Sequence, residues 1–193
     1  MDALRRLADA GVRVPEPYCC IDGVLLMELV TDGDGGVAPR LGDVEMSAEM
    51  ALEDHAVVMQ YITRMLCAGL VHGDLSEFNV LVDDTGPVII DLPQAVDAAA
   101  NNNAEMMLAR DVNKITDYYA LFAPELKHSQ YAKEIWALYE DGALHPDVEL
   151  SGDFEESSVA ADVDVVLDEI KAAWQEEQDR LLRMSDYDEC QAS

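Results

Sequence analysis

Residues 70–82 read LVHGDLSEFNVLV, and residues 88–94 read VIIDLPQ. Each stretch contains an apolar, largely β-branched run, which predicts a short buried strand. The Asp-Asp-Thr-Gly run between the two stretches predicts the tight turn of a β-hairpin. Such a hairpin would return Asp91, which follows its second strand, to the side of Asp74 and Asn79, which precede its first strand. The sequence therefore predicts three polar side chains that point at one centre.

These side chains match what phosphoryl transfer from ATP requires, namely a base and oxygen ligands for Mg²⁺. Phosphotransferases of the kinase fold take them from the pattern H-x-D-x-x-x-x-N and from a second Asp after the next β-ribbon. His72, Asp74 and Asn79 have that spacing, and Asp91 follows twelve residues after Asn79. The plain alternative is a hairpin with ordinary polar turns, and it leaves the combination of both motifs unexplained.

The sequence around the motifs resembles the RIO family of atypical serine/threonine kinases. That family typically reads H-G-D-L-S-E-[FY]-N and D-x-[SP]-Q, and this chain has HGDLSEFN at residues 72–79 and DLPQ at residues 91–94. The resemblance includes the pattern L-x-x-A-G-V-x-x-P-x-P at residues 7–17, LLMELV at residues 25–30 and LARDV at residues 108–112. It covers most of the chain from residue 4 to about residue 150.

The resemblance implies a catalytic role for each of the three polar side chains. Asp74 would be the proton acceptor, and Asn79 and Asp91 would be Mg²⁺ ligands. Asp91 would also be the site of a transient aspartyl-phosphate, because some family members are thought to act as ATPases of that kind. ATP and Mg²⁺ are thus the expected cofactors, and the protein substrate is unknown.

The resemblance also implies an adenine site in the hinge between two lobes. Glu28 and Val30 would present backbone groups to adenine, Met27 would be the adjacent pocket residue, and Leu81 would lie under the base. A complete family member has a Gly-rich loop, a strand lysine and a paired helix Glu before this point. The first lysine of this chain is Lys114, beyond the catalytic loop.

Two expectations follow from that departure. Residues 1–193 alone should have negligible kinase activity, because the loop and the lysine normally orient the phosphates. The chain is expected to begin within or just after the helix that would carry the Glu, as an unrecognised upstream start or a truncated gene would explain.

The hydrophobic periodicity predicts an α+β fold that is mainly helical with a small β-ribbon. The family resemblance implies that this fold is a protein-kinase-like C-terminal lobe, plus remnant strands of an N-terminal lobe. The expected helices lie at residues 3–10, 47–68, 103–122, 130–139 and 159–183, and the expected strands at residues 18–21, 24–29, 70–82 and 87–92. Three divisions are expected: an N-lobe remnant at residues 1–30, the C-lobe at residues 31–150, and an acidic helix and tail at residues 151–193.

Composition bounds the size of the core and the cellular compartment that we expect for the protein. Half of the 193 residues are apolar, which suffices for one core. The sequence contains no apolar run of about 18 residues and no secretion signal at its start, so neither a membrane span nor export is expected. Four cysteines without regular spacing predict free thiols in a reducing cytoplasm; they are Cys19, Cys20, Cys67 and Cys190.

Charge is the unusual property of the chain. Forty acidic and twelve basic residues give a formal net charge of −28, so direct binding of nucleic acid is disfavoured. Residues 141–193 hold 16 acids and 3 bases. A solvated, repelling surface, such as salt-tolerant organisms use, is the simpler interpretation, and a dedicated basic partner is the sharper one.

Two other functions remain open beside that of a RIO-type kinase or ATPase. A small-molecule phosphotransferase of kinase-like fold is disfavoured by Ser76-Glu77 and Pro93-Gln94, where those enzymes usually differ. A non-catalytic binding module would explain the missing lysine but not the intact set of polar side chains. Association with ribosomal precursors is implied by the family resemblance only.

Three further sites have an expected structural role. His72 is expected to brace the catalytic loop by hydrogen bonding. Arg110-Asp111 would either support that loop through an ion pair or lie on a helix surface, and the sequence leaves both open. Ala123-Pro124-Glu125 resembles the end of a kinase activation loop, but helical spacing around it favours a turn between two helices.

Overall fold

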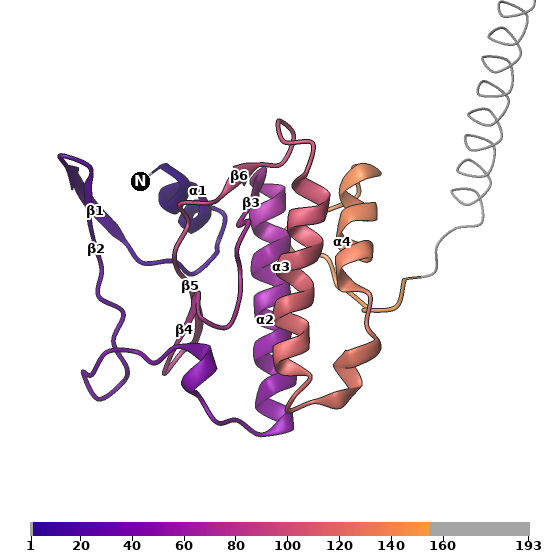
Figure 1. The fold of residues 1–193 in the computed structure, drawn as a ribbon, viewed down its shortest axis with the longest axis horizontal. Helices are drawn as coiled ribbons and strands as arrows, with labels where there is room; N and C mark the ends of the chain where they lie inside the picture. Colours follow the sequence, from indigo (N-terminus) through magenta and orange to yellow (C-terminus); the bar gives the residue numbers. More distant parts are fainter. Residues whose placement is uncertain (1, 155–193) are drawn as a thin grey trace, which may run out of the picture. The chain divides into compact units, whose positions relative to one another are not determined.

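Three helices form the body of the protein in the computed structural model, which describes residues 2–154. They are α2 (Ala48–Cys67), α3 (Ala104–Tyr119) and α4 (Tyr131–Glu140), and they lie side by side (Figure 1). Apolar side chains spaced three or four residues apart face the shared core; they include Val58, Ile62, Leu66, Leu108, Val112, Ile115 and Ile135. The Ser47 hydroxyl caps α2 by accepting a hydrogen bond from Met50 N at 3.2 Å.

The four expected helices that fall within residues 2–154 are confirmed with shifted ends. α3 stops at Tyr119, three residues short of the predicted range 103–122. Backbone bonds of the tighter i to i+3 type follow it, from Leu121 N to Tyr118 O and from Phe122 N to Tyr119 O. Pro124 cannot continue a helix and restricts the residue before it. The predicted turn is there, as the 3-10 helix η2 (Pro124–His128).

Three two-stranded antiparallel sheets accompany the helices. β1 (Pro17–Ile21) pairs with β2 (Val24–Met27), β3 (Leu70–Val71) with β6 (Val96–Asp97), and β4 (Val80–Asp83) with β5 (Gly86–Ile89). With the short helices α1 (Asp2–Asp9) and η1 (Leu41–Asp43), the fold is α+β, as predicted.

The strands differ from the prediction in length and number. The second and fourth predicted strands are shorter, ending at Met27 and Ile89. The fourth cannot reach residue 92, because Asp91 takes a positive φ that no strand allows. The predicted stretch 70–82 is two strands separated by the loop of residues 72–79, the candidate catalytic loop. β6 was not predicted, since two residues are too few to show a periodicity.

The N-terminal segment is tied to the β4–β5 hairpin. Arg13 donates to both carboxylate oxygens of Asp83 and, at 3.2 Å, to Gly86 O. Arg13 O in turn accepts from Ile89 N at 2.9 Å. The guanidinium lowers the pKa of the Asp83 carboxyl far below its usual range. This anchor fixes α1 and the segment leading to β1 relative to the hairpin that precedes Asp91.

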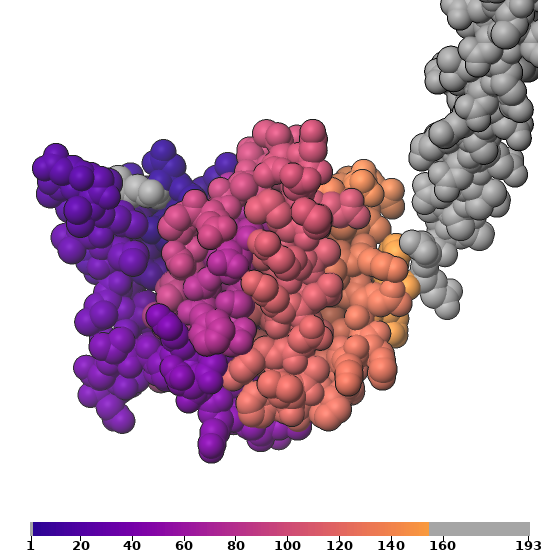
Figure 2. Space-filling view, in the orientation of Figure 1, coloured from indigo at the N-terminus to yellow at the C-terminus, as the bar shows by residue number. Residues whose placement is uncertain are grey.

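The β1–β2 hairpin carries an exposed apolar surface. It extends as an arm away from the three helices (Figure 2). Val24 is 70% exposed and Leu26 is 58% exposed, and several neighbours are similarly open. Two strands alone bury little apolar area, and most apolar side chains of this pair are exposed.

Three further expectations concern membrane-spanning helices, the state of the cysteine thiols and the C-terminal helix. No helix among residues 2–154 combines the length and the apolar character that crossing a membrane requires. Cys19, Cys20 and Cys67 are free thiols, as predicted. The predicted helix 159–183 and Cys190 lie outside the described residues.

A buried histidine makes stability depend on pH. His55 Nε2 lies 3.0 Å from Thr116 Oγ1, between the rings of Tyr119 and Tyr131, and burial lowers its pKa to about 4. The unfolded chain therefore binds this proton more readily between about pH 6.5 and pH 4, so the free energy of unfolding should fall across that window as pH decreases. The loss should total about 3 kcal/mol.

Urea unfolding at stepped pH measures this effect. His55→Gln keeps an amide near Thr116 but does not titrate, so it should reduce the slope between pH 6.5 and pH 4 relative to the unaltered chain. Identical slopes in the two proteins would contradict the assignment to His55.

Candidate active site

The loop from β3 to β4 holds two of the predicted site residues in a fixed relation. Asn79 N donates to Ser76 O at 2.9 Å, which closes a turn at the end of the loop. The Asn79 side chain crosses the loop, and its Nδ2 donates to Asp74 O at 2.8 Å. This bond orients the amide, so Oδ1 is the Asn79 atom that remains for another partner; it makes no hydrogen bond with residues 2–154.

A closed ring of four hydrogen bonds joins the loop to Ile90, the residue between β5 and Asp91. Asp74 N donates to His72 Nδ1 at 3.3 Å, and His72 Nε2 bonds to Ile90 O at 2.9 Å. Ile90 N donates to Asn79 O at 3.0 Å, and the bond from Asn79 to Asp74 completes the ring. The two bonds of His72 require the tautomer with its proton on Nε2. The predicted bracing role of His72 is confirmed.

Asp91 stands next to this ring in an unusual backbone conformation. Its φ is +65°, in the left-handed region that Asp tolerates better than most residues. The neighbouring Ile90 is held at both its N–H and its C=O, so the chain turns out of β5 at this residue. The Asp91 side chain is exposed. Hydrogen bonds of Ile90 to Asn79 and His72 tie the backbone just before Asp91 to the loop, and the place of the Asp91 carboxylate beside Asn79 and Asp74 stays a prediction.

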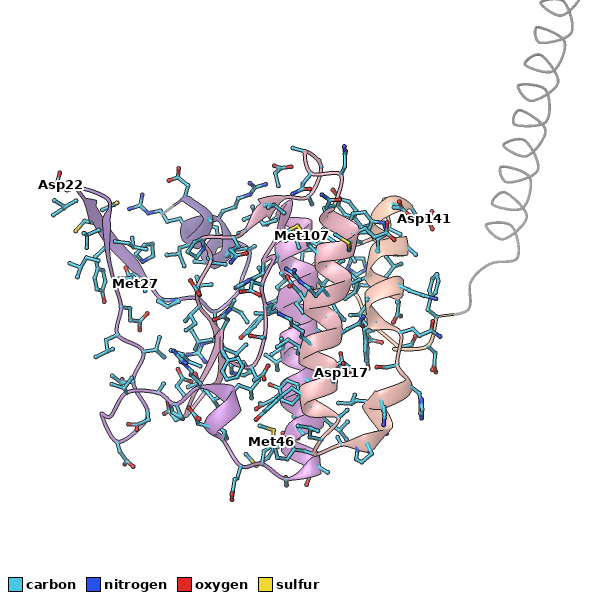
Figure 3. The ribbon with its side chains drawn as sticks, in the orientation of Figure 1. Asp22, Met27, Met46, Met107, Asp117 and Asp141 are labelled. Carbon is cyan, nitrogen blue, oxygen red and sulfur yellow. The ribbon has the colours of Figure 1, made fainter. Side chains whose placement is uncertain are left out.

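Gly73 allows the loop to pass close to the segment after Asp91. Its φ is +85°, and a Cβ there would lie 2.6 Å from Met107 Cε and 2.7 Å from Gln94 O. A backbone oxygen at that distance cannot move aside without shifting the segment after Asp91. Met107 lies on α3 (Figure 3), so this glycine brings loop, α3 and segment together.

α3 supports the catalytic loop from below through Arg110 and Asp111. The buried Asp111 carboxylate accepts hydrogen bonds from Gly73 N at 2.7 Å and from Leu75 N at 3.1 Å. Arg110 donates to Gly73 O. Burial raises the pKa of Asp111, and the two backbone donors oppose that rise. Of the two alternatives for Arg110-Asp111, support of the loop is therefore correct. The support comes from hydrogen bonds to the loop backbone, and within residues 2–154 no ion pair joins Arg110 to Asp111.

One contact was missed by the sequence reasoning. Lys114 Nζ lies 3.2 Å from Asp74 Oδ1, and the two side chains are 41% and 42% exposed. Lys114 is one helical turn beyond Arg110 on α3, so both cations face the same loop. The position of Lys114 on a helix that supports the loop was the available signal, but it becomes informative only when α3 is known to pack there.

The predicted adenine-site residues divide into two groups. Val30 is buried with Ala38 and Val88, and Leu81 packs against them. Met27 and Glu28 are exposed, and Met27 lies out on the hairpin arm (Figure 3).

Some backbone N–H and C=O groups of Glu28 and Val30 are hydrogen-bonded within the described residues, and others are not. Glu28 N donates to Glu16 O at 2.8 Å, and Val30 O accepts from Ala38 N at 3.1 Å. Among the hydrogen bonds of the described residues, none uses the carbonyl of Glu28 or the amide of Val30. One free acceptor and one free donor, two residues apart, therefore remain at the hinge.

The donor set suits Mg²⁺ shared with phosphate. Residues 2–154 contain no group of three His, Cys, Asp or Glu side chains placed to hold a metal. Asn79 Oδ1 and the Asp91 carboxylate are hard oxygen donors. Mg²⁺ is commonly bound through one or two protein oxygens together with phosphate oxygens and water. The residues present therefore fit this ion when a nucleotide supplies further ligands.

Comparisons with known proteins agree on one family. A family model described as RIO domain matches residues 1–132. The RIO-type serine/threonine-protein kinase Rio1 of Haloferax volcanii is 43% identical over 116 residues, which are 60% of this chain and 39% of the relative. The human serine/threonine-protein kinase RIO1 is 35% identical over 141 residues, 72% of this chain and 23% of the relative. The matched region thus spans less than half of either relative.

The buried carboxylate of Asp111 yields a stability prediction. Asp111→Ala leaves the N–H groups of Gly73 and Leu75 without an acceptor, and it should lower the free energy of unfolding by about 3 kcal/mol. Asp111→Asn keeps one acceptor oxygen and should cost about half as much. Urea unfolding measures both.

Asp117→Ala, on the exposed side of the same helix (Figure 3), controls for the loss of an aspartate from α3. Hydrogen exchange at Gly73 N and Leu75 N should accelerate in Asp111→Ala alone. Equal destabilisation by the two alanine variants would show that the bonds to the loop contribute little.

Proposed function

This chain belongs to the RIO family, and from that premise we propose that it carries the phosphoryl-transfer site of a RIO-type serine/threonine kinase or ATPase that uses Mg-ATP. The observation that carries the proposal is the closed ring of hydrogen bonds through His72, Asp74, Asn79 and Ile90. It ties the backbone of Asp74 and the side chain of Asn79 to Ile90, the residue before Asp91, and so supports a site in which a base and two oxygen donors keep fixed positions, as positioning of phosphates requires.

Each side chain has a separate role in the proposed transfer. Asp74 accepts the proton of the hydroxyl that attacks the terminal phosphorus of ATP. Asn79 Oδ1 and the Asp91 carboxylate hold Mg²⁺. When bound, Mg²⁺ neutralises charge on the phosphate oxygens. The ring holds the backbone of Asp74, of Asn79 and of Ile90, which precedes Asp91, and this supports a fixed spacing of the base and the ligands.

The hinge supplies the adenine contacts in this proposal. The free carbonyl of Glu28 accepts a hydrogen bond from the adenine amino group, and the free amide of Val30 donates to a ring nitrogen. Leu81 packs under the base, and Met27 borders the pocket. Support comes from the unused backbone groups and from the apolar cluster of Val30 and Leu81.

Turnover by residues 1–193 alone is proposed to be negligible. The sequence has no lysine before Lys114, and the hairpin arm exposes an apolar surface of the kind that further strands cover. We propose that a lobe that orients the phosphates completes the enzyme at this arm. One alternative function, a non-catalytic binding module, makes a different prediction. Even after the missing lobe is added, such a module would bind nucleotide but would not turn it over.

Substrate class, location and partners also remain proposals. A serine or threonine hydroxyl of a protein is proposed as acceptor, in the cytoplasm, and a small-molecule acceptor is the alternative. Association with ribosomal precursors stays a prediction, and the charge of −28 argues that any such contact would be made through protein. Transient phosphorylation of Asp91 also stays a prediction; labelled phosphate on Asp91 that hydroxylamine releases would identify it.

Nucleotide binding by the chain tests the proposal without requiring turnover. Calorimetry should give an affinity for ATP that depends on Mg²⁺, and Asn79→Ala or Asp91→Asn should lower it by about tenfold or more, because each removes one oxygen ligand. Asp74→Asn should leave it within about threefold, since a base acts in the transition state.

Asp22→Asn is the matched control for Asp91→Asn. Asp22 is also a non-glycine residue with positive φ, 51°, but it lies at the tip of the hairpin arm (Figure 3). Binding that is unaffected by chelation of Mg²⁺, or lowered as much by Asp22→Asn as by Asp91→Asn, would reject the proposed metal site.

A further inference from the structure

Lys114 occupies a position that its contribution to the fold does not explain. Its contact with Asp74 joins two side chains that are each about two-fifths exposed, and such pairs contribute little to stability. Its neighbours on α3 are engaged differently: Asp111 accepts two bonds from the loop backbone, and Arg110 donates to Gly73 O. Lys114 alone among these three reaches a side chain of the catalytic loop.

The charge of the chain makes this position more informative. Only twelve of 193 residues are basic, against forty acidic ones. Two of the twelve, Arg110 and Lys114, lie four residues apart on the face of α3 that meets the catalytic loop. The Arg110 guanidinium is held by a backbone carbonyl, whereas the Lys114 ammonium ends a flexible four-carbon stem. The Lys114 ammonium lies beside Asp74, the proposed base, in a strongly acidic protein. A positive charge at this position favours the binding of an anion next to Asp74.

We propose that Lys114 binds the terminal phosphate of the nucleotide beside Asp74, an inference that rests on the proposed function. An attacking hydroxyl that gives its proton to Asp74 lies between that carboxylate and the terminal phosphorus. The phosphate oxygens are then within a few ångströms of the ammonium that contacts Asp74 Oδ1 at 3.2 Å. Without nucleotide, Asp74 holds the ammonium in place; with nucleotide, the phosphate oxygens take it over by charge-assisted hydrogen bonds.

This role differs from simple positioning of Asp74. If Lys114 only positioned the Asp74 carboxylate, neither nucleotide would contact it. Replacing Lys114 would then change the affinities for ATP and for ADP by the same factor. A lysine that binds the terminal phosphate of ATP contributes to the affinity for ATP and not to that for ADP, which lacks this group. The ratio of the two affinities therefore separates the alternatives.

Titration calorimetry with Mg-ATP and Mg-ADP measures that ratio in the whole chain. Lys114→Met should lower the affinity for ATP by about tenfold, the loss of one charge-assisted hydrogen bond, and change that for ADP by less than about twofold. Lys114→Arg keeps the charge and should retain most of the affinity for ATP. Lys127→Met, an exposed lysine on η2, removes the same charge elsewhere and should change neither affinity.

Three outcomes would overturn the inference: equal loss for both nucleotides in Lys114→Met, no loss for either, or the same loss in Lys127→Met. In each case binding by the unaltered chain, with its dependence on Mg²⁺ and Asp91, would leave the proposed function intact. If the unaltered chain bound neither nucleotide, the proposed function would be rejected and this inference with it.

Discussion

The hydrogen bonds from Gly73 N and Leu75 N to the buried carboxylate of Asp111 are the interaction on which the site depends. They fix the backbone on both sides of Asp74, so the direction of that side chain follows from the position of α3. Burying a carboxylate without hydrogen-bond partners destabilises the folded protein. Burying the two backbone N–H groups without their acceptor would destabilise it as well. The loop and the helix therefore hold each other in one arrangement.

The rest of the site builds on that arrangement. With the loop fixed, His72 and Asn79 bond to Ile90, just after β5, and the next residue, Asp91, turns the chain with a positive φ. Strain of this kind persists only where the surrounding structure over-determines it. Lys114 reaches Asp74 for the same reason, because it lies one turn beyond residues that hold the loop.

The sequence predicted what depends on local pattern. The spacing of Asp74, Asn79 and Asp91 and the strands around them indicated the hairpin return, and periodicity indicated α2 almost to the residue. Prediction was incomplete where a partner lies far along the chain: the sequence left open whether Arg110-Asp111 supports the loop or lies on a helix surface. Asp111 is 36 and 38 residues from the loop amides that it binds, and its environment is visible only after α3 packs. The free backbone groups at Glu28 and Val30 likewise depend on which neighbours use the others.

In the proposed site, Asp74, Asn79 and Asp91 surround one metal–phosphate centre. Paramagnetic broadening of backbone amides by Mn²⁺ with ATP, in place of Mg²⁺, measures where the ion binds. We expect broadening centred on residues 73–81 and 90–92, lost in Asn79→Ala, with the hairpin tip at Asp22 unaffected. Broadening spread over the acidic surface, or centred on Asp32 and Asp34, would contradict it.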